Sequence, residues 1–375
     1  MKKKYFFLYI QAGGGHISTA KAIARYMDKH YSSAIDPVLI DGFTEAPGWL
    51  KNIIIDGYKK SQTTGQRVYE FLYRCNKRRF IAKICQVILS RLLQGYIKRL
   101  IIKERPDHIV ILHFFLVRPT VHMIKKLKLD IPVTTIITDP FTIHKLRSLD
   151  KKMNYVVFSD QAKDRIVKRG VASEQVKICP VILKEEFSHP LSSEKVREKK
   201  KELGLSSEKK VIFIMGAGDG MPKGEKIVQE IIDTKINAQI MIVCGKNQKL
   251  FRDTQAIAHQ HPEYMIKIFG FVDFMYDLVN VADIIITKGG PATLMEILMM
   301  NKIPVINSYI WEQEKGNVDF IVHNNVGFYQ PNIKKMVKIV DEMLQSDLSV
   351  YHQNIQKLQL KNGTQEVVEY LMERV

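Results

Sequence analysis

The sequence predicts an α/β fold made of two doubly wound domains, each built on a parallel sheet. Three observations lead to this prediction: apolar runs of strand length recur along the chain, helix-like segments separate them, and glycine-rich turns follow several of the runs. A chain of 375 residues is also longer than one ordinary core requires. Because a polar stretch at 180–210 separates two series of runs, we expect a first domain at 1–185 and a second at 186–349.

The first domain begins with a strand at 5–10, which leads through a glycine turn into a helix at about 19–29. A short apolar run follows at 37–40. Between 66 and 103, isoleucine and leucine recur at spacings of three to five residues, which predicts helix. Further buried strands are expected at 108–112, 133–137 and 155–158.

The second domain repeats the alternation of strand and helix. Its strands are expected at 211–215, 239–243, 266–269, 284–287 and 305–307. The clearest helices lie at 223–234 and 293–301. Ligands of doubly wound sheets bind beyond the carboxyl ends of the strands, so the loops that follow these strands are the candidate binding sites.

The chain carries a formal charge of +18, and residues 51–104 hold 13 Lys and Arg against 3 Asp and Glu. Such a segment indicates an acidic partner, which is an anionic lipid, a nucleic acid or a phosphorylated ligand. Within 58–103 the basic residues alternate with aromatic and aliphatic ones, as in a helix that lies on an anionic membrane surface. An ordinary helix with a core-facing apolar side and a solvated basic side is the alternative. No recognised nucleic-acid-binding motif is present, so we expect no nucleic-acid partner.

The four cysteines are far apart in the sequence and form no CxxC pair. A disulfide framework or a zinc site is therefore not expected, and reduced thiols in the cytoplasm fit this pattern. The apolar run near the N-terminus is too short for a signal peptide, and no apolar stretch is long enough to span a bilayer. We expect a protein that is soluble or lies on a membrane surface.

The first candidate loop, Gly13-Gly14-Gly15-His16, follows the first strand. Glycines allow a ligand to approach the backbone closely, and the helix that follows offers unpaired N–H groups. His16 would then stand where an imidazole can take a proton from a hydroxyl group. A tight turn with a solvent-exposed histidine is the alternative.

Two glycine turns in the second domain suit the binding of phosphate. Residues 215–220, Met-Gly-Ala-Gly-Asp-Gly, follow a strand and can close their backbone amides on an anion, or form only a structural turn. Gly289 and Gly290 lead into a helix with Pro291 near its start, which provides a second anion site. One turn further, Glu296 can accept hydrogen bonds from both hydroxyls of a ribose, or merely favour the helix dipole.

A last polar segment, at 311–317, follows the next strand and is rich in carboxylate and amide groups. As a loop at the carboxyl end of a strand, it suits a polyhydroxylated sugar. A solvated charged loop is the alternative.

In their order and combination, these loops resemble the donor domain of the family-28 glycosyltransferases, which have the GT-B fold. The match is closest to the monogalactosyldiacylglycerol synthases and the processive diacylglycerol glucosyltransferases, and the MurG enzymes are more distant. The N-terminal half carries similar motifs, namely GGGHISTA at 13–20, Arg105-Pro106-Asp107 with His113-Phe114, Thr138-Asp139 with His144, and Pro180-Val181 with Phe187. The resemblance covers almost the whole chain. It implies two domains that face each other across a cleft, with a last helix at about 350–375 that packs onto the first.

The resemblance also implies roles for individual residues. His16 and Asp139 are the candidate catalytic residues: His16 would act at the acceptor hydroxyl or on the donor phosphates, and Asp139 lies with His144 on the acceptor side. Gly14 and Gly15 would lie beside the donor. The implied contacts of the diphosphate are Gly216, Gly218, Gly220, Gly290, Pro291 and Thr293. The remaining implied contacts are Phe271 and Val272 for uracil, Glu296 for ribose, and Gln313 and Glu314 for the hexose, with Asn317 just behind them.

Five residues depart from the family pattern. Ala217, Ala292 and Glu312 stand where glycine is usual, and Leu112 and Phe114 interrupt a Thr-His-Pro-Phe motif. An alanine fits these turns only where φ is negative. Because the changes fall on the acceptor and sugar sides, they bear on the substrate more than on the donor class.

The resemblance implies an inverting transfer of a hexose from a UDP-sugar to a membrane lipid, most closely diacylglycerol. The enzyme would be cytoplasmic and bound peripherally to the cytoplasmic face of a membrane. No metal ligands are predicted and no cofactor is required; Mg²⁺ could assist, although no DxD motif indicates it. The alternatives are a polyprenyl-linked or other glycolipid acceptor, as for MurG, a UDP-sugar epimerase of the same architecture, and a non-catalytic UDP-sugar sensor.

Overall fold

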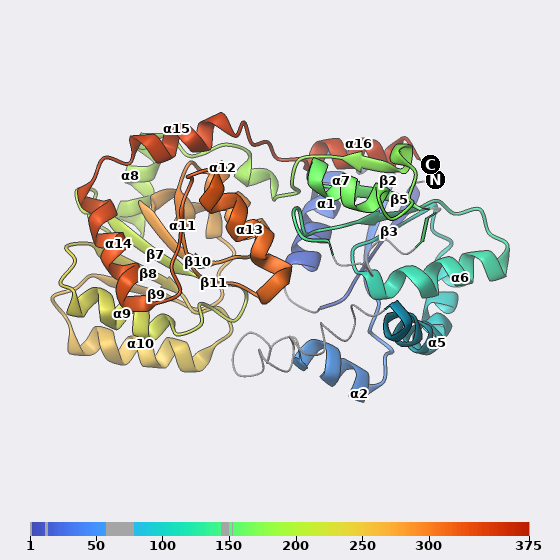
Figure 1. The fold of residues 1–375 in the computed structure, drawn as a ribbon, viewed down its shortest axis with the longest axis horizontal. Helices are drawn as coiled ribbons and strands as arrows, with labels where there is room; N and C mark the ends of the chain where they lie inside the picture. The colour runs from blue at the N-terminus through green and yellow to red at the C-terminus, as the bar shows by residue number, and fades with distance from the viewer. Residues whose placement is uncertain (1, 12–13, 58–78, 144–149, 152, 375) are drawn as a thin grey trace. The chain divides into compact units, whose positions relative to one another are not determined.

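The computed structural model describes residues 2–11, 14–57, 79–143, 150–151 and 153–374 of the chain (Figure 1). The chain divides into two compact units. Unit 1 comprises Met1–Glu185 and Asn362–Val375, and unit 2 comprises Glu186–Lys361. Each unit contains one six-stranded sheet in which all neighbouring strands are parallel, so the predicted α/β fold is confirmed.

The sheet of unit 1 has the strand order β2-β1-β3-β4-β5-β6. Its strands are β1 (Lys3–Tyr9), β2 (Ile35–Asp41), β3 (His108–Ile111), β4 (Val133–Ile136), β5 (Asn154–Val157) and β6 (Val176–Ile178). Because every pairing is parallel, the carboxyl ends of these strands share one edge of the sheet.

The helices of unit 1 fill the connections between its strands. They are α1 (Gly15–Tyr31), α2 (Gly48–Lys51), the π-helix η1 (Asn52–Asp56), α5 (Arg79–Glu104), the short η2 (Phe114–Leu116), α6 (Val117–Leu127), α7 (Asp160–Val167), η4 (Ser173–Gln175) and α16 (Thr364–Met372); η5 (Glu185–Ser188) spans the division of the units. Helix α5 is the described part of the helix predicted at 66–103. The segment 58–78, and with it Lys77 and Arg78 of the predicted basic surface, lies outside the described residues.

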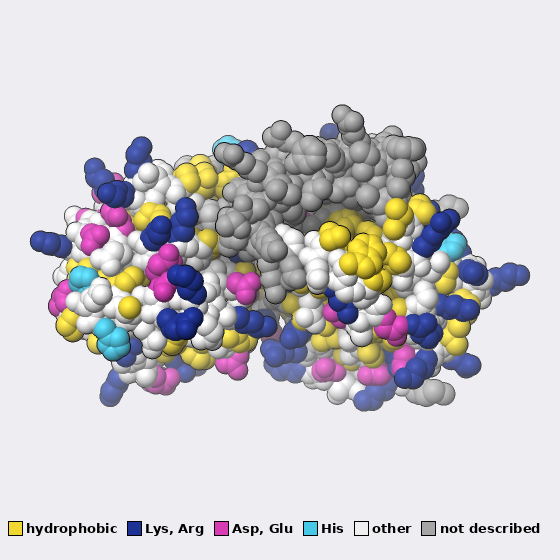
Figure 2. Space-filling view, turned by 90° about the horizontal axis from the view of Figure 1, so that it is seen from below, with side chains coloured by type: hydrophobic (Ala, Val, Ile, Leu, Met, Phe, Trp, Pro, Cys, Tyr) yellow, Lys and Arg dark blue, Asp and Glu magenta, His cyan; other side chains and the backbone are white. Residues whose placement is uncertain are grey.

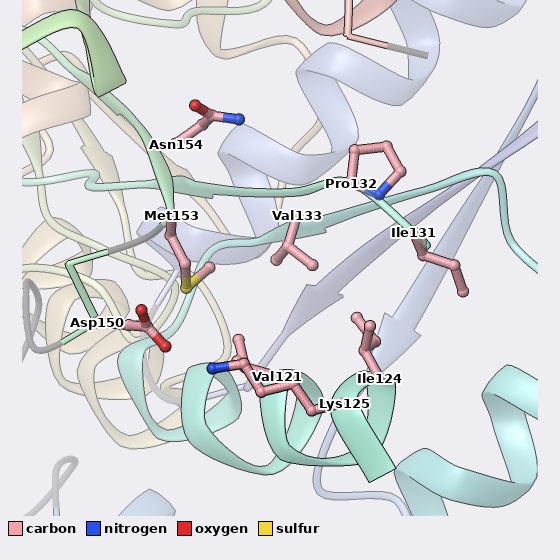
Figure 3. Close-up of a pocket in the computed structure, with 9 residues that line it drawn as sticks. All are labelled: Val121, Ile124, Lys125, Ile131, Pro132, Val133, Asp150, Met153 and Asn154. Carbon is pink, nitrogen blue, oxygen red and sulfur yellow. The ribbon is translucent and has the colours of Figure 1, made fainter. Parts of the chain in front are cut away.

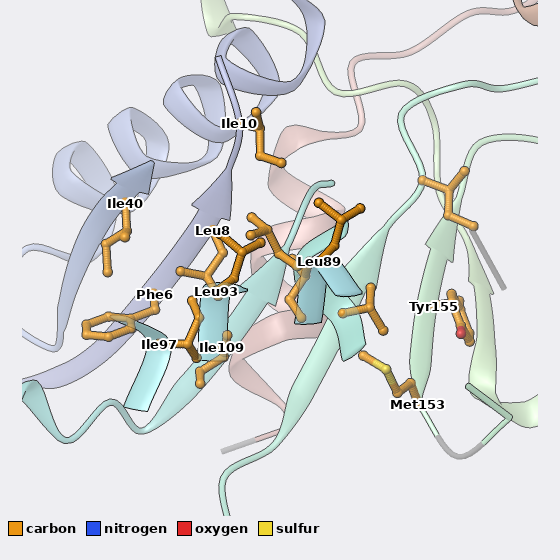
Figure 4. Close-up of a cluster of buried hydrophobic side chains, with 14 of the residues drawn as sticks. Phe6, Leu8, Ile10, Ile40, Leu89, Leu93, Ile97, Ile109, Met153 and Tyr155 are labelled. Atoms are coloured by element: carbon orange, nitrogen blue, oxygen red, sulfur yellow. The ribbon is translucent and has the colours of Figure 1, made fainter. Parts of the chain in front are cut away.

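Both faces of the unit 1 sheet are buried, as expected of a parallel sheet. Along β1, Phe6 and Leu8 belong to a core shared with α5 (Figure 4). The alternate residues Tyr5 and Phe7 belong to a second core, shared with α1 and α16. The continuous apolar run that predicted this strand is therefore one strand that serves two cores.

The sheet of unit 2 has the strand order β12-β11-β10-β7-β8-β9. Its strands are β7 (Val211–Met215), β8 (Gln239–Val243), β9 (Ile266–Phe269), β10 (Ile284–Lys288), β11 (Ile303–Ser308) and β12 (Phe328–Tyr329). Its helices are α8 (Ser193–Glu202), α9 (Gly224–Asp233), α10 (Gln248–Gln260), α11 (Met275–Val281), α12 (Pro291–Met299), α13 (Trp311–His323), α14 (Ile333–Gln345) and α15 (Ser349–Lys357). Helices α9, α10 and α14 lie together on one face of this sheet, and α8, α11, α12 and α13 lie on the other (Figure 1).

The single helix predicted at about 350–375 is wrong, because the structure has two helices there. Helix α15 belongs to unit 2, whereas α16 packs against α1 of unit 1. The two helices are separated by a non-helical segment that includes Asn362 and Gly363. A Cβ on Gly363 would lie 2.0 Å from the carbonyl oxygen of Pro180. The side chain of Asn362 accepts hydrogen bonds from the amides of Leu183 (3.2 Å) and Thr364 (3.1 Å), which holds this turn against unit 1.

None of the helices in the described part of the chain is both long enough and apolar enough to cross a membrane.

Candidate functional site

His16 lies at the carboxyl edge of the unit 1 sheet. It stands in the first turn of α1, directly after the glycine turn that follows β1, and its side chain is 9% exposed. Its Nδ1 is 3.2 Å from Oγ1 of Thr138, which follows β4. Its ring meets the ring of His113, which follows β3, edge to face with 4.9 Å between centroids. Three strand ends therefore bring two imidazoles and a hydroxyl group together.

The contact with Thr138 bears on what His16 can do chemically. In the tautomer whose Nδ1–H donates to the hydroxyl group of Thr138, Nε2 is the ring atom that can accept a proton. A second contact orients His113, whose Nδ1 accepts from the amide of Phe115 at 3.4 Å. Asp139, next to Thr138, is 5% exposed and adds a carboxylate at the same edge. The group fits general acid–base work on a hydroxyl group.

The glycine turn before α1 is open. Gly14 and Gly15 are exposed, and a Cβ built on either would meet no other atom within 4 Å. Gly14 is the N-cap of α1, so no side chain caps this helix and its first amides can serve an external ligand. Gly13 and His144, which the resemblance also includes, lie outside the described residues.

In unit 2, the 216–220 loop forms a tight turn after β7. The amide of Gly220 donates to the carbonyl oxygen of Ala217 at 2.7 Å, and Gly220 has a φ of +73°. A Cβ on Gly216 would lie 2.1 Å from the carbonyl oxygen of Gly220, whereas one on Gly218 would meet nothing within 4 Å. Gly216 and Gly220 therefore close the turn, and Gly218 leaves its outer side open.

The second glycine turn joins β10 to α12. The amide of Gly289 donates to Ser308 and that of Gly290 to Lys288, both at 2.8 Å, so neither is left for a ligand. Pro291 occupies the first helical position and has no N–H. In the first turn of α12, the donors without helical partners are therefore Ala292 and Thr293. Glu296 follows in the next turn and is half-buried.

The departures from the family pattern fit their turns. Ala217, Ala292 and Glu312 all have negative φ. An alanine or glutamate therefore stands at each position without backbone strain.

The prediction of a loop at 311–317 is wrong, because these residues begin helix α13. The carboxylate of Glu314 turns back and accepts from the amide of Ile310, the N-cap, at 2.7 Å. This bond satisfies a backbone donor at the start of the helix. The polar composition of 311–317 does not distinguish such a helix start from a loop.

On helix α13, the two residues predicted to hold the hexose differ in the burial of their side chains. Glu314 is 5% exposed and Gln313 is half-buried. Asn317, one turn further on, is 1% exposed and donates through Nδ2 to the carbonyl oxygen of Gly289 at 2.9 Å. Glu314 and Asn317 therefore face the glycine turn before α12.

Phe271 follows β9 and is 68% exposed. The ammonium group of Lys246, which follows β8, lies 5.7 Å from the centroid of its ring. An exposed aromatic ring at the carboxyl end of a strand suits contact with a flat base, and Val272 lies next to it.

Lys288, the last residue of β10, is not among the predicted site residues, and it is only 9% exposed. Burial lowers its pKa, while the carboxylates of Glu314 and Asp219 act in the opposite direction. Asp219 belongs to the 216–220 loop, so Lys288 lies within electrostatic reach of both glycine turns. A lysine at the end of an apolar strand, directly before two glycines, is the sequence signal that would have identified it.

Within the described residues, no group of three or more His, Cys, Asp or Glu side chains is arranged to hold a metal ion. A pocket of about 260 Å³ in unit 1 lies between α6 and the amino ends of β4 and β5 (Figure 3). Its lining includes Val133 and Asn154, the first residues of those strands. This is the edge opposite His16, so the pocket is separate from the candidate site.

Two doubly wound units, with glycine turns at the carboxyl edges of their parallel sheets, are the architecture of the GT-B fold. Solved structures agree with this fold. MurG of Acinetobacter baumannii superposes with a TM-score of 0.61 at 12% identity over 100% of both chains. The UDP-GlcNAc 2-epimerase of Neisseria meningitidis bound to UDP-GlcNAc gives 0.62 at 11%, again over 100% of both chains.

Sequence comparisons identify the family. The sequence model described as monogalactosyldiacylglycerol (MGDG) synthase matches residues 16–181, and that of the glycosyltransferase family 28 C-terminal domain matches residues 190–368. The chain belongs to the family-28 glycosyltransferases, as the sequence motifs predicted.

Relatives of known name are similar over nearly the whole chain. A probable monogalactosyldiacylglycerol synthase, chloroplastic, of Nicotiana tabacum is 26% identical over 386 residues, which cover 100% of this chain and 71% of the relative. A processive diacylglycerol beta-glucosyltransferase of Bacillus pumilus is 27% identical over 380 residues, which cover 99% and 95%.

Proposed function

We propose that this glycosyltransferase moves a hexose from a UDP-hexose to the hydroxyl group of diacylglycerol, with inversion at the anomeric carbon. The observation that carries the proposal is the pairing of two halves in one chain. Residues 16–181 match the MGDG synthase model, and unit 2 has two glycine turns within a family-28 C-terminal domain. The relatives named for diacylglycerol substrates are similar across both halves.

In the proposed reaction, the acceptor oxygen attacks the anomeric carbon of the hexose. The bond from that carbon to the β-phosphate oxygen breaks, and UDP leaves with the bonding electrons. The acceptor proton passes to Nε2 of His16, which Thr138 orients through Nδ1. Asp139 is the second candidate for this proton, and it lies at the same sheet edge.

The donor would be held by unit 2. The amides of Ala292 and Thr293 and the turn of Gly216, Gly218 and Gly220 would receive the diphosphate, and the α12 dipole would stabilise its charge as it leaves. In this proposal Glu296 binds the ribose, Phe271 and Val272 hold uracil, and Gln313 contacts the hexose. Gly14 and Gly15 would adjoin the donor from α1.

A membrane surface is the proposed source of the acceptor. Three elements of unit 1 carry large exposed hydrophobic side chains: Trp49 of α2 is 55% exposed, Ile53 of η1 63%, and Ile88 of α5 51%. Figure 2 shows a group of hydrophobic side chains on the face of unit 1 that carries α2, with both basic and acidic side chains near it. Together with the net charge of +18, this composition favours peripheral binding to an anionic, cytoplasmic membrane face.

The test is a matrix of donors and acceptors with the intact chain. UDP-glucose, UDP-galactose and UDP-N-acetylglucosamine are each combined with vesicles that contain diacylglycerol or a polyprenyl-linked sugar, in anionic or neutral lipid. We expect a hexosyl-diacylglycerol with the β-configuration, release of UDP, and faster turnover on the anionic vesicles.

Three outcomes contradict the proposal. Release of UMP would mean that a sugar phosphate is transferred, and product from the polyprenyl-linked acceptor alone would place the enzyme with MurG. Conversion of the UDP-sugar into its epimer without any acceptor would establish an epimerase.

A further inference from the structure

Lys288 combines burial with charge at the carboxyl edge of the unit 2 sheet. Its side chain is 9% exposed. A buried ammonium group is costly unless opposite charges or hydrogen bonds compensate it. The carboxylates within electrostatic reach are Glu314 on α13 and Asp219 in the 216–220 loop.

The sheet places this lysine beside both glycine turns. Strand β10 pairs in parallel with β7, with Ile286 opposite Ile214. Lys288 therefore ends its strand next to the start of the 216–220 loop. The residue after it, Gly289, begins the turn into α12, whose first amides point toward the carboxyl edge.

Helix α13 contacts the turn that follows Lys288. Glu314 is anchored through Oε2 to the amide of Ile310, and its Oε1 lies 3.9 Å from the place where a Cβ on Gly290 would be. Asn317 holds the carbonyl oxygen of Gly289 through Nδ2, while its buried Oδ1 has no hydrogen-bond partner among the described residues. Asn317 thus bonds directly to the turn that follows Lys288, and Glu314 lies beside this turn while it holds the start of α13.

We propose that the ammonium group of Lys288 binds the diphosphate of the donor and stabilises it as it leaves, and that Glu314 positions the turn instead of reading the hexose. The inference rests on the proposed use of a UDP-hexose. A diphosphate near the 216–220 loop would meet the negative charge of Asp219, and a cation at this edge offsets that repulsion. The amides of α12 supply hydrogen bonds but only a partial positive charge, so a full charge adds what the helix lacks.

The first experiment measures the binding of UDP, UMP and uridine to the intact chain by calorimetry. We expect Lys288→Met to weaken UDP binding by roughly tenfold or more, as for the loss of a charged hydrogen bond, and to leave uridine binding unchanged. Lys302→Met is the matched control. Lys302 is half-buried, with its pKa lowered to about 8 by desolvation, but it precedes β11 at the opposite, amino edge of the same sheet.

The outcomes separate this inference from the proposed function. If the wild-type chain does not bind UDP, the proposed function fails. If the wild-type chain binds UDP and Lys288→Met binds it equally well, or if uridine binding falls as much as UDP binding, the assignment of Lys288 is overturned while the donor class stands.

A second pair of variants tests Glu314 and does not depend on whether Lys288→Met folds. We expect Glu314→Ala to weaken the binding of UDP and of UDP-hexose by the same factor, because the start of α13, which lies beside the turn, is no longer held at Ile310. Glu314→Gln should restore both affinities, since a carboxamide oxygen can still accept from the amide of Ile310. If Glu314→Gln binds UDP normally but UDP-hexose poorly, Glu314 contacts the sugar and its positioning role is overturned.

Discussion

The two units have sheets of the same size and direction, but the carboxyl edges of these sheets carry different chemistry. The edge of unit 1 gathers His16, His113 and Asp139, which are groups that exchange protons. The edge of unit 2 gathers glycine turns, the start of α12 and the buried Lys288, which are groups that receive negative charge. One scaffold, used twice, thus acquires two roles through the loops that follow its strands.

The largest effect is expected for His16→Ala, which removes the proposed proton acceptor from the carboxyl edge of unit 1 and so tests the difference between the two edges. We expect kcat to fall roughly 10²–10⁴-fold, the usual range for general-base catalysis, with UDP affinity unchanged. The control is His30→Ala on the same helix, where the ring lies tilted against that of Tyr26 and its Nε2 lies 3.3 Å from Glu185. Loss of UDP affinity in His16→Ala would place this histidine on the donor instead.

His108 should make the stability of unit 1 depend on pH, and this effect must be separated from the pH dependence of activity at the His16 site. His108, at the start of β3, is fully buried, and desolvation lowers its pKa from 6.5 to about 4. Between these values the unfolded chain binds a proton that the folded chain does not, so stability falls as the pH is lowered through this window. Above pH 6.5 both states hold His108 neutral, and it causes no loss of stability. At pH 5 the free energy of unfolding should be lower by about 2 kcal/mol.

The measurement is denaturant unfolding at pH 7 and pH 5, with His108→Gln as the comparison. The amide of glutamine can keep a hydrogen bond to Thr134, which lies 3.0 Å from Nε2 of His108, but it does not titrate. The variant should therefore lose less stability than the wild type between the two pH values. Equal losses would mean that His108 does not cause the acid sensitivity.

The smallest effect is expected for Glu296→Ala at the carboxyl edge of unit 2, which should change the affinity for the donor and not the rate of the chemical step. We expect UDP affinity to fall about tenfold and the preference for UDP over 2′-deoxy-UDP to disappear, because the carboxylate would no longer accept from the ribose hydroxyl. Glu225→Ala, in the first turn of α9, is the matched control. A preserved preference for UDP in Glu296→Ala would remove the ribose assignment.

Sequence patterns predicted the architecture well because a parallel sheet buries both faces. Runs such as 5–10 and 211–215 are apolar throughout, and glycines mark the turns that follow them. The order of the motifs predicted the family, which the comparisons confirm. The roles of the individual site residues stay predictions.

Two predictions failed where a contact that composition does not show shaped the local structure; the contact lies within one helix turn in the first case and between distant residues in the second. The 311–317 segment forms a helix because Glu314 turns back to the amide of Ile310. The last helix is interrupted because the chain at Gly363 passes against Pro180, too closely for any side chain. Polar composition in the first case and helical propensity in the second said nothing of these neighbours.

By itself, the sequence determined the two α/β units, their glycine turns and the family, since these depend on local periodicity and on motifs that are contiguous along the chain. Only the tertiary structure decided which side chains act together. Thr138 meets His16 across 122 residues, and Asn317 meets Gly289 across 28. In the sequence Lys288 is a lysine that ends a strand before two glycines, and packing adds that it is buried near two carboxylates. The physical reason is that burial and charge compensation depend on every neighbour in space, whereas a strand or a turn needs only the residues beside it in the chain.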